Sequence, residues 1–117
     1  MPVAPELQVK CTPGECRHVV KKANELHPVL RDPTIIAERA HIFQALGNET
    51  RLKILGLLAV QELCVCDIVT AMGRASSTLA HHIRMLEDAG VIKSREEGKF
   101  TLYSLNVGLL RKHRIFD

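Results

Sequence analysis

Hydrophobic residues recur at helical spacing through the first half of the chain, a pattern that predicts three helices. The first lies within residues 17–27, and the second runs from about Thr34, whose hydroxyl suits an N-cap, to Leu46. The second is expected to bury Ile35, Ile36, Ala40, Phe43 and Leu46. The third follows Asn48, another N-cap residue, and its wide apolar face marks it as the central core helix. That face contains Leu52, Ile54, Leu55, Leu57, Leu58 and Val60.

The middle of the chain has the pattern of a helix-turn-helix. Residues 67–72 are predicted to form a short helix, and residues 73–75, which begin with a glycine, a tight turn. Ser76 or Ser77 then caps a second amphipathic helix that ends at Gly90. Two short helices joined by a short Gly-containing turn are typical of a helix-turn-helix.

A β-hairpin is predicted directly after the second of these helices. Residues 91–95 and 100–105 read as its strands, and residues 96–99 as its loop. Such a hairpin is a wing, so the fold class is a mainly α winged helix-turn-helix with a small β-hairpin. Asn106 then caps a terminal helix, residues 107–115, whose apolar residues have no obvious partner in so small a domain. We expect these residues to pack against a second subunit of a dimer; they are Val107, Leu110 and Ile115.

The chain begins with a segment that differs from the rest. Pro2, Pro5, Pro13 and Gly14 argue against a long helix over residues 1–16, so we interpret this segment as a flexible arm. Residues 17–117 are then one winged helix-turn-helix domain for DNA binding and dimerisation. The arm ends in a predicted turn that brings Cys11 and Cys16 close together. The alternative is a disordered tail with incidental cysteines.

Composition and charge narrow the class of protein. The 117 residues, 46% hydrophobic and 25% charged, suit one domain with one core. No apolar run is long enough to span a membrane and no signal-peptide layout is present, so we expect a cytoplasmic protein. The net charge is +3, and the whole surplus of Lys and Arg lies in residues 70–117, which favours a polyanion-facing surface there. Aromatic residues make up only 3%, which argues against RNA or single-strand recognition by stacking.

The four cysteines form two pairs that suit metal binding. Thiols stay reduced in a cytosolic protein, so clustered cysteines indicate a metal site or redox chemistry. Cys64 and Cys66 lie in a predicted extended piece, where residues two apart point the same way and can share one ion. The following helix start lowers the pKa of Cys66 in part, because Asp67 opposes the effect. Cys64 has a plainer alternative as a small buried hydrophobic residue.

Thiolate ligands select soft or borderline ions, such as Cd, Pb, Zn and Cu(I). Cys11 and Cys16 would complete a set of three or four sulfur ligands around Cys64 and Cys66. Four thiolates suit Cd or Zn, whereas three suit Pb or As(III). His18 is a candidate nitrogen ligand, although a histidine on a helix surface is the commoner case.

The polar face of the second helix of the helix-turn-helix is a candidate DNA-reading surface. Recognition helices lie in the major groove and contact bases with residues of their early turns. Hydroxyls and imidazoles bond base edges or phosphates, and Arg74 and Arg84 are placed to anchor phosphates. Lys99 lies at the wing tip and Arg95 on the strand leading to it. The full candidate set is Arg74, Ser76, Ser77, Thr78, His81, His82, Arg84, Arg95 and Lys99. The alternative for each is a solvated polar face, and for one histidine a hydrogen bond within the protein.

Several stretches of sequence together resemble the ArsR/SmtB family of metal-responsive repressors. These are LGNETRLKIL, ELCVCDI, SSTLAHHIRMLEDAGVI and the EEGK wing, and the resemblance covers roughly residues 37–106. The added N-terminal cysteines are most similar to the CadC-like branch that senses cadmium and lead. The resemblance implies a homodimer that binds double-stranded operator DNA and is released when Cd, Pb, or in some members Zn or As(III), binds cysteine thiolates. It implies the metal ligands Cys64, Cys66, Cys11 and Cys16, within one subunit or across two.

Two departures from the family pattern matter. Arsenic sensors of the common type have a third cysteine where this chain has Val69. Zinc and nickel/cobalt sensors have Asp and His on the terminal helix, where this chain has Asn106, Val107 and Gly108. His113 alone cannot build that second site.

Three other functions remain compatible with parts of the pattern. A repressor of the same fold could sense oxidants or persulfides through its thiols. A winged-helix interaction module could hold structural zinc. A thiol enzyme would use Cys66 as nucleophile with His81 or His82 as base, but no substrate pocket, phosphate loop or third orienting residue is evident, so we expect no enzyme.

Overall fold

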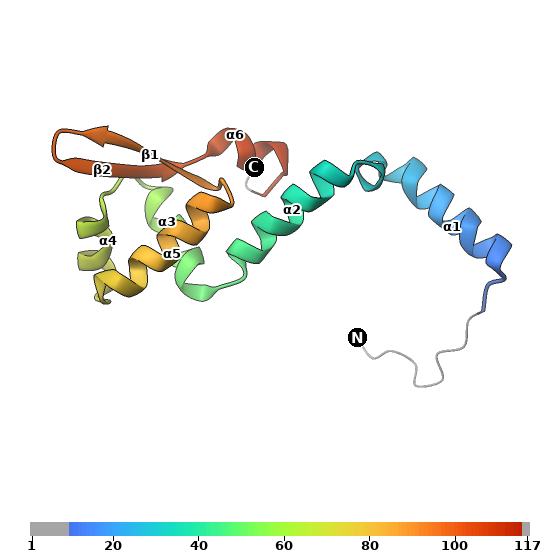
Figure 1. Cartoon of the computed structure of the whole chain (residues 1–117), viewed down its shortest axis with the longest axis horizontal. Coiled ribbons are helices and arrows are strands. Elements are labelled where there is room, and N and C mark those ends of the chain that lie inside the picture. Colours follow the sequence, from blue (N-terminus) through green and yellow to red (C-terminus); the bar gives the residue numbers. More distant parts are fainter. Residues whose placement is uncertain (1–9, 116–117) are drawn as a thin grey trace. The chain divides into compact units, whose positions relative to one another are not determined.

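The computed structural model describes residues 10–115 and divides the chain into two units, residues 1–36 and 37–117, which are described separately (Figure 1). The predicted fold class is confirmed, because the chain is mainly helical and has a single two-stranded antiparallel hairpin within the described residues. No helix between residues 10 and 115 is both long and apolar enough to cross a bilayer.

The first unit contains helix α1, Pro13–Leu26, and a 3-10 turn, Pro28–Arg31. The prediction that α1 begins at residue 17 is wrong, because Thr12 caps a helix that starts at Pro13. The Thr12 hydroxyl accepts a hydrogen bond from the Glu15 N–H at 3.1 Å. Proline is tolerated in the first turn because no intrahelical partner exists there for its missing N–H. Cys16 therefore lies in a helix and not in a turn.

Helix α2, Pro33–Leu46, is capped by Asp32 and not by Thr34 as predicted. The Asp32 carboxylate accepts hydrogen bonds from the N–H groups of Thr34 and Ile35. The predicted buried face is also wrong in part. Ile42, Ala45 and Leu46 are buried, whereas Phe43 is 53% exposed.

Helix α3, Glu49–Leu58, supplies the centre of the core, as predicted. The Asn48 side chain accepts a hydrogen bond from the Arg51 N–H at 3.1 Å, which confirms the cap. Ile54, Leu55 and Leu58 are buried, while Leu52 and Val60 remain exposed.

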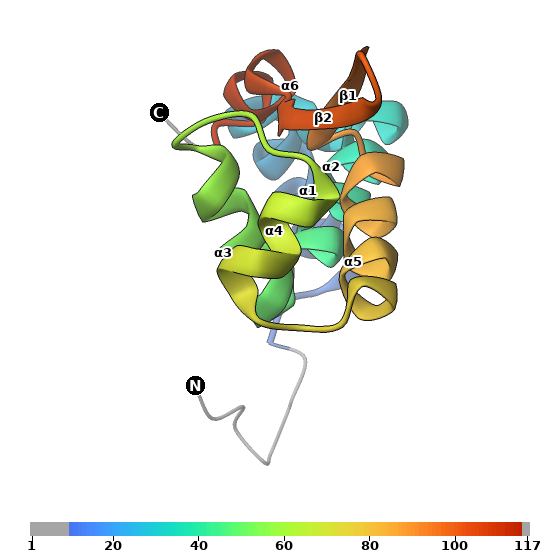
Figure 2. The ribbon, with the colours of Figure 1, turned by 90° about the vertical axis from the view of Figure 1, so that its left-hand side faces the viewer.

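The helix-turn-helix consists of α4, Val65–Met72, and α5, Ser76–Asp88, which pack side by side (Figure 2). Gly73 ends α4 in the left-handed conformation, with φ of 64°, which glycine adopts without steric cost. The N-cap of α5 is Ala75 and makes no side-chain hydrogen bond, so the predicted serine cap is wrong. Ser76 and Ser77 lie in the first helical turn.

The wing pairs β1, Ile92–Glu97, with β2, Phe100–Leu105, in antiparallel register. Glu97 lies opposite Phe100, so only two residues form the turn, and Gly98 supplies its positive φ of 60°. The first strand is therefore longer than predicted. Leu63 adds an isolated bridge on Tyr103 of β2.

Helix α6, Val107–Lys112, follows β2 and is capped by Asn106, as predicted (Figure 1). The expectation that its apolar residues lack a partner within the chain is wrong for two of the three. Leu110 is 2% exposed and Ile115 packs against the core of the same chain. Val107 is 47% exposed.

A buried histidine joins α6 to α2 within the second unit. His113 is 5% exposed, and its Nδ1 accepts a hydrogen bond from Arg39 Nε at 3.0 Å. Because arginine can only donate, the ring proton lies on Nε2, which donates to Glu38 Oε1 at 2.6 Å. This hydrogen bond from His113 is the main reason that the pKa of the Glu38 carboxyl is lowered. A hydrogen bond from Lys112 and the positive charge of Lys112 also lower it, while burial opposes them.

Candidate thiol site and nucleic-acid interface

Cys64 is the N-cap of α4, the first helix of the helix-turn-helix. Its backbone is extended, with φ of −86° and ψ of 168°, and Val65 begins the helix. Asp67 completes a capping box. Its carboxylate accepts from both the Cys64 N–H and the Cys64 thiol at 3.2 Å, and its N–H donates to the Cys64 sulfur.

The two thiols of the pair lie close together but in different surroundings. Cys64 is 8% exposed, whereas Cys66 is exposed. The predicted extended piece is wrong at Cys66, which lies in the first turn of α4. Two side chains at positions i and i+2 of a helix point in different directions. This does not apply to the pair, because Cys64 precedes α4 and only Cys66 lies inside it. Cys66 is among the groups that raise the pKa of the Cys64 thiol, so the two thiols are neighbours.

The environment of Cys64 opposes its ionisation. A hydrogen bond from the Asp67 N–H lowers the pKa of Cys64, as a helix start does. The thiol's hydrogen bond to the Asp67 carboxylate, burial, the hydrogen bond with Cys66 and the negative charge of Asp67 together outweigh it. The net pKa is raised, so the Cys64 thiol is protonated in this conformation at neutral pH.

Cys11 and Cys16 form a disulfide at the start of α1, with their Cα atoms 5.8 Å apart. The prediction that these two cysteines lie close together is confirmed. Their role as metal ligands stays a prediction, and it requires reduction to thiols. His18 is exposed on α1.

The donors present fit a thiophilic ion by their chemistry, since two free thiols and a carboxylate lie at one helix start. In the part of the chain that the structure describes, no three His, Cys, Asp or Glu side chains are arranged to hold an ion. A complete site at Cys64 and Cys66 therefore needs further ligands and a movement of the pair.

The candidate DNA-binding residues share an exposed surface of α5, its preceding turn and the wing. All are exposed except His82, which is half-buried. Burial, followed by the positive charges of Arg51, His81 and Arg74, lowers the pKa of His82. His82 is therefore neutral at pH 7 and offers a hydrogen-bonding imidazole.

Arg51 of α3 is a residue that the sequence analysis missed. Its charge lies close enough to His82 to lower that pKa, and its Nε, like His82 Nδ1, is buried without a hydrogen-bond partner among the described residues. In the sequence Arg51 is one of several polar residues at the start of α3, beside Glu49, Thr50 and Lys53. Its partner His82 lies on another helix, so local patterns could not reveal the contact.

Arg95, assigned to DNA by the sequence, is engaged within the protein. Its guanidinium donates to both carboxylate oxygens of Glu62, from Nε at 2.9 Å and Nη2 at 2.8 Å. Its Nη1 also pairs with Glu97 Oε2 at 2.7 Å. These contacts raise the pKa of Arg95 and lower that of Glu62. Lys99 stays exposed in the turn of the wing.

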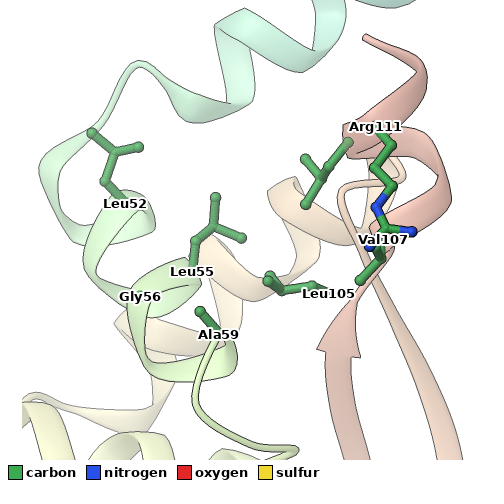
Figure 3. Close-up of a pocket in the computed structure, with 8 residues that line it drawn as sticks. Leu52, Leu55, Gly56, Ala59, Leu105, Val107 and Arg111 are labelled. Carbon is green, nitrogen blue, oxygen red and sulfur yellow. The ribbon is translucent and has the colours of Figure 1, made fainter. Parts of the chain in front are cut away.

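An apolar pocket of about 520 Å³ opens between α3 and α6 (Figure 3). Leu52, Leu55 and Ala59 of the α3 region face Leu105 and Val107 across it. The remaining lining residues are Gly56, Leu110 and Arg111. Leu52 and Val107 are about half exposed. Contact of such apolar side chains with water is unfavourable, so the pocket is a surface suited to an apolar partner.

The sequence was compared with family models and curated proteins. Residues 48–94 match the model of bacterial regulatory proteins of the arsR family. A cadmium resistance transcriptional regulatory protein CadC homolog from Staphylococcus aureus is 43% identical over 68 residues, which cover 57% of this chain and 56% of that protein. An arsenical resistance operon repressor from the same organism is 36% identical over 73 residues, covering 62% of this chain and 70% of that protein. The chain thus spans little more than half the length of the CadC homolog it matches.

Solved structures share the fold. The homodimeric winged helix-turn-helix DNA-binding domain of Mb0332 from Mycobacterium bovis has a TM-score of 0.65 and 30% identity, covering 73% of this chain and 80% of that one. An ArsR-like transcriptional regulator from Rhodococcus has a TM-score of 0.65 and 28% identity, covering 68% of this chain and 76% of that one. These relatives are named as regulators of transcription.

Proposed function

The chain belongs to the arsR family of bacterial regulatory proteins, and from this premise we propose that it is a homodimeric metal-responsive repressor. It binds operator DNA and is released from it when a thiophilic ion binds. One observation carries the proposal. The free thiols of Cys64 and Cys66 lie at the start of the first helix of the helix-turn-helix, whose second helix, α5, carries exposed polar side chains.

The repressor reads DNA with α5 and the wing. Each subunit places α5 in the major groove of one half-site, about one helical turn from the other half-site. Ser76, Ser77, Thr78, His81 and His82 face bases and phosphates. Arg74, Arg84 and Lys99 anchor phosphates, whereas Arg95 is held by Glu62 and Glu97. The proposed location of the repressor is the cytoplasm, where its operator DNA lies.

Cys64, Cys66, Cys11 and Cys16 form the metal-ligand set of the proposal. Reduction by a dithiol breaks the Cys11–Cys16 bond and adds two electrons and two protons, which yields two further thiols. Bound metal supplies positive charge that holds the sulfurs as thiolates. The set suits Cd and Pb best, with Zn and As(III) as further candidates, in keeping with relatives named for cadmium and arsenical resistance.

Release follows from a change at the start of α4. Cys64 donates to Asp67 in the capping box, and it must give up that proton and its buried position to become a ligand. The box then opens and the first helix of the helix-turn-helix shifts relative to α5. A coupling of about 1–3 kcal/mol, or about 5- to 150-fold in operator affinity, is typical of such linkage.

The dimer is supported by the apolar surface on α6 and α3. Val107 of α6 and Leu52 of α3 are about half exposed, and both line the apolar pocket. A second copy that covers this surface removes these two side chains from water.

The test titrates Cd, Pb, Zn and As(III) into reduced protein bound to labelled DNA from upstream of its own gene. Thiolate charge-transfer absorption and DNA anisotropy are followed together. We expect one ion to bind stoichiometrically and to weaken DNA binding at least fivefold. Cys64→Ser should bind the DNA as the wild type does but keep it when metal is added. Release of DNA by metal from Cys64→Ser at wild-type concentrations would contradict the proposal.

The disulfide favours a second candidate, a thiol-redox or persulfide sensor of the same fold. In this structure one cysteine pair is oxidised while the other is free. Under this alternative, peroxide or polysulfide weakens DNA binding in the presence of a chelator, and metal under strict reduction does not. Specific binding to the upstream DNA in this test would exclude a winged-helix module with structural zinc.

A further inference from the structure

The segment that carries Cys64 is joined to the wing by backbone hydrogen bonds. The Leu63 N–H donates to the Tyr103 carbonyl at 3.1 Å, and the Tyr103 N–H donates to the Leu63 carbonyl at 2.8 Å. Tyr103 pairs on its other side with Ser94 of β1. Leu63 is therefore joined to the wing by an isolated β-bridge, and it directly precedes Cys64, a candidate metal ligand.

A side-chain contact joins the same two parts. Glu62 accepts two hydrogen bonds from Arg95, which lies on β1 and also pairs with Glu97 at the end of that strand. The Arg95 guanidinium thus bridges one carboxylate of the cysteine segment and one of the wing. Bidentate pairs of arginine and carboxylate fix orientation as well as distance.

A shared ion changes the position of this segment. Cys66 is exposed while Cys64 is 8% exposed, so Cys64 must move outward to share a ligand site with Cys66. Leu63 both donates a backbone hydrogen bond to Tyr103 of β2 and accepts one from it. A movement of Cys64 is therefore passed through Leu63 to the hairpin. A cavity of about 170 Å³, lined by Val65, Tyr103 and four residues of α5, leaves room for it. The α5 residues are Ala80, Ile83, Arg84 and Glu87.

We infer that the Glu62–Arg95 pair couples metal binding at Cys64 and Cys66 to the position of the wing. Glu62 is thus a positioning residue for DNA release, and it touches neither metal nor DNA. The inference rests on the proposed function and adds the route by which the signal leaves the thiol site. Ser94 of β1 also bonds Glu87 of α5 at 3.0 Å, so a moving wing also acts on the recognition helix.

The test compares Glu62→Gln with Glu96→Gln as matched control. Glu96 lies on β1 next to Arg95. Its carboxylate accepts a hydrogen bond from Thr101 of the wing and not from the cysteine segment. An exposed ion pair contributes little to folding stability, so both variants should fold. Three quantities are measured: DNA affinity without metal, metal stoichiometry by thiolate absorption, and the ratio of DNA affinities without and with metal.

For Glu62→Gln we expect metal stoichiometry equal to that of the wild type, DNA affinity without metal within about twofold, and an affinity ratio at least threefold smaller. Glu96→Gln should keep the wild-type ratio, and Glu62→Asp, which retains the charge, should restore part of it. A wild-type ratio in Glu62→Gln overturns the coupling alone. If the wild-type protein binds metal and keeps its DNA, the proposed function falls and the coupling falls with it.

Discussion

At the residue scale, two cysteines with one residue between them have different properties because a helix begins between them. Cys64 caps α4, is buried and donates its thiol proton to Asp67, whereas Cys66 is exposed in the first turn. The hydrogen bond to the Asp67 carboxylate and burial outweigh the lowering by the Asp67 N–H, so the pKa of the Cys64 thiol is raised. The pair therefore combines an accessible thiol with one whose release from the capping box changes the start of a helix.

A residue-scale prediction concerns the acid sensitivity of the Glu38–His113 contact. Glu38 has a pKa lowered from 4.5 in the folded state, chiefly by the hydrogen bond from His113. A lowered folded pKa stabilises the fold above the unfolded pKa, and this stabilisation is lost as the pH falls through the folded pKa. The free energy of unfolding of the wild type should therefore exceed that of Glu38→Gln at pH 7, and the excess should shrink below pH 4.5.

Urea denaturation of both proteins at equal concentration, over a pH series on either side of 4.5, measures this difference. Glu49→Gln is the control, because it removes a carboxylate from the first turn of α3 and leaves the contact between Glu38 and His113 in place. An excess that grows as the pH is lowered would contradict the prediction.

At the element scale, α5 is presented to DNA by its two neighbours. The Gly73 turn fixes the angle between α4 and α5, and Ser94 and Tyr103 of the wing lie against α5 near Glu87. Three apolar residues of α5, Leu79, Ile83 and Leu86, are buried, so the opposite face is left for polar contacts. The helix thus has one face for the core and one for a ligand.

An element-scale prediction concerns the phosphate contact of Arg84. We expect Arg84→Ala to weaken binding to the upstream DNA several-fold and to reduce the slope of log affinity against log salt by about 1, since each phosphate contact releases about one counterion. Anisotropy titrations at several salt concentrations measure the slope. Lys22→Ala, which removes an exposed positive charge from α1, should keep the wild-type slope. An unchanged slope in Arg84→Ala would remove this residue from the interface.

At the scale of the whole molecule, the second unit has one core and one apolar surface that its own chain leaves open. The core joins α2, α3, α4, α5, β1 and α6 through buried aliphatic residues. The open surface includes Val107 and the pocket between α3 and α6. A family member of known structure is homodimeric, which agrees with a second copy on such a surface.

A whole-molecule prediction tests that surface. Val107→Glu puts a charge on a half-exposed site and should convert the protein into a folded monomer, because a buried unpaired charge is unfavourable in the dimer. Affinity for the two-fold operator should fall by about tenfold or more, since one subunit contacts only one half-site.

Sedimentation measures the mass, and circular dichroism checks the fold. Val60→Glu is the matched control, because Val60 is 81% exposed and does not line the pocket. A dimer of Val107→Glu with wild-type affinity for DNA would place the interface elsewhere.

Structural features that depend on residues a few positions apart in the chain were predictable from the sequence. Asn48 and Asn106 cap helices by bonding an N–H three residues on, and Gly73 ends a helix by its own backbone freedom. The helix-turn-helix, the wing and the closeness of Cys11 and Cys16 follow from such local spacing. The cap at Asp32 was missed because two polar residues near one helix start compete, and only the backbone geometry decides between them.

Only the tertiary structure decided which residues meet across the chain. Arg95 bonds Glu62 from 33 positions away and His113 bonds Glu38 from 75, and periodicity carries no information on such pairs. The structure also buried Leu110 in its own core and left Phe43 exposed, although both fit an apolar helical face. By itself the sequence determined the helices, the wing and the chemistry of the thiols, because these depend on neighbours in the chain. Packing determined the partners of Arg95 and His113 and the burial of Cys64, because burial and long-range hydrogen bonds exist only once the elements have come together.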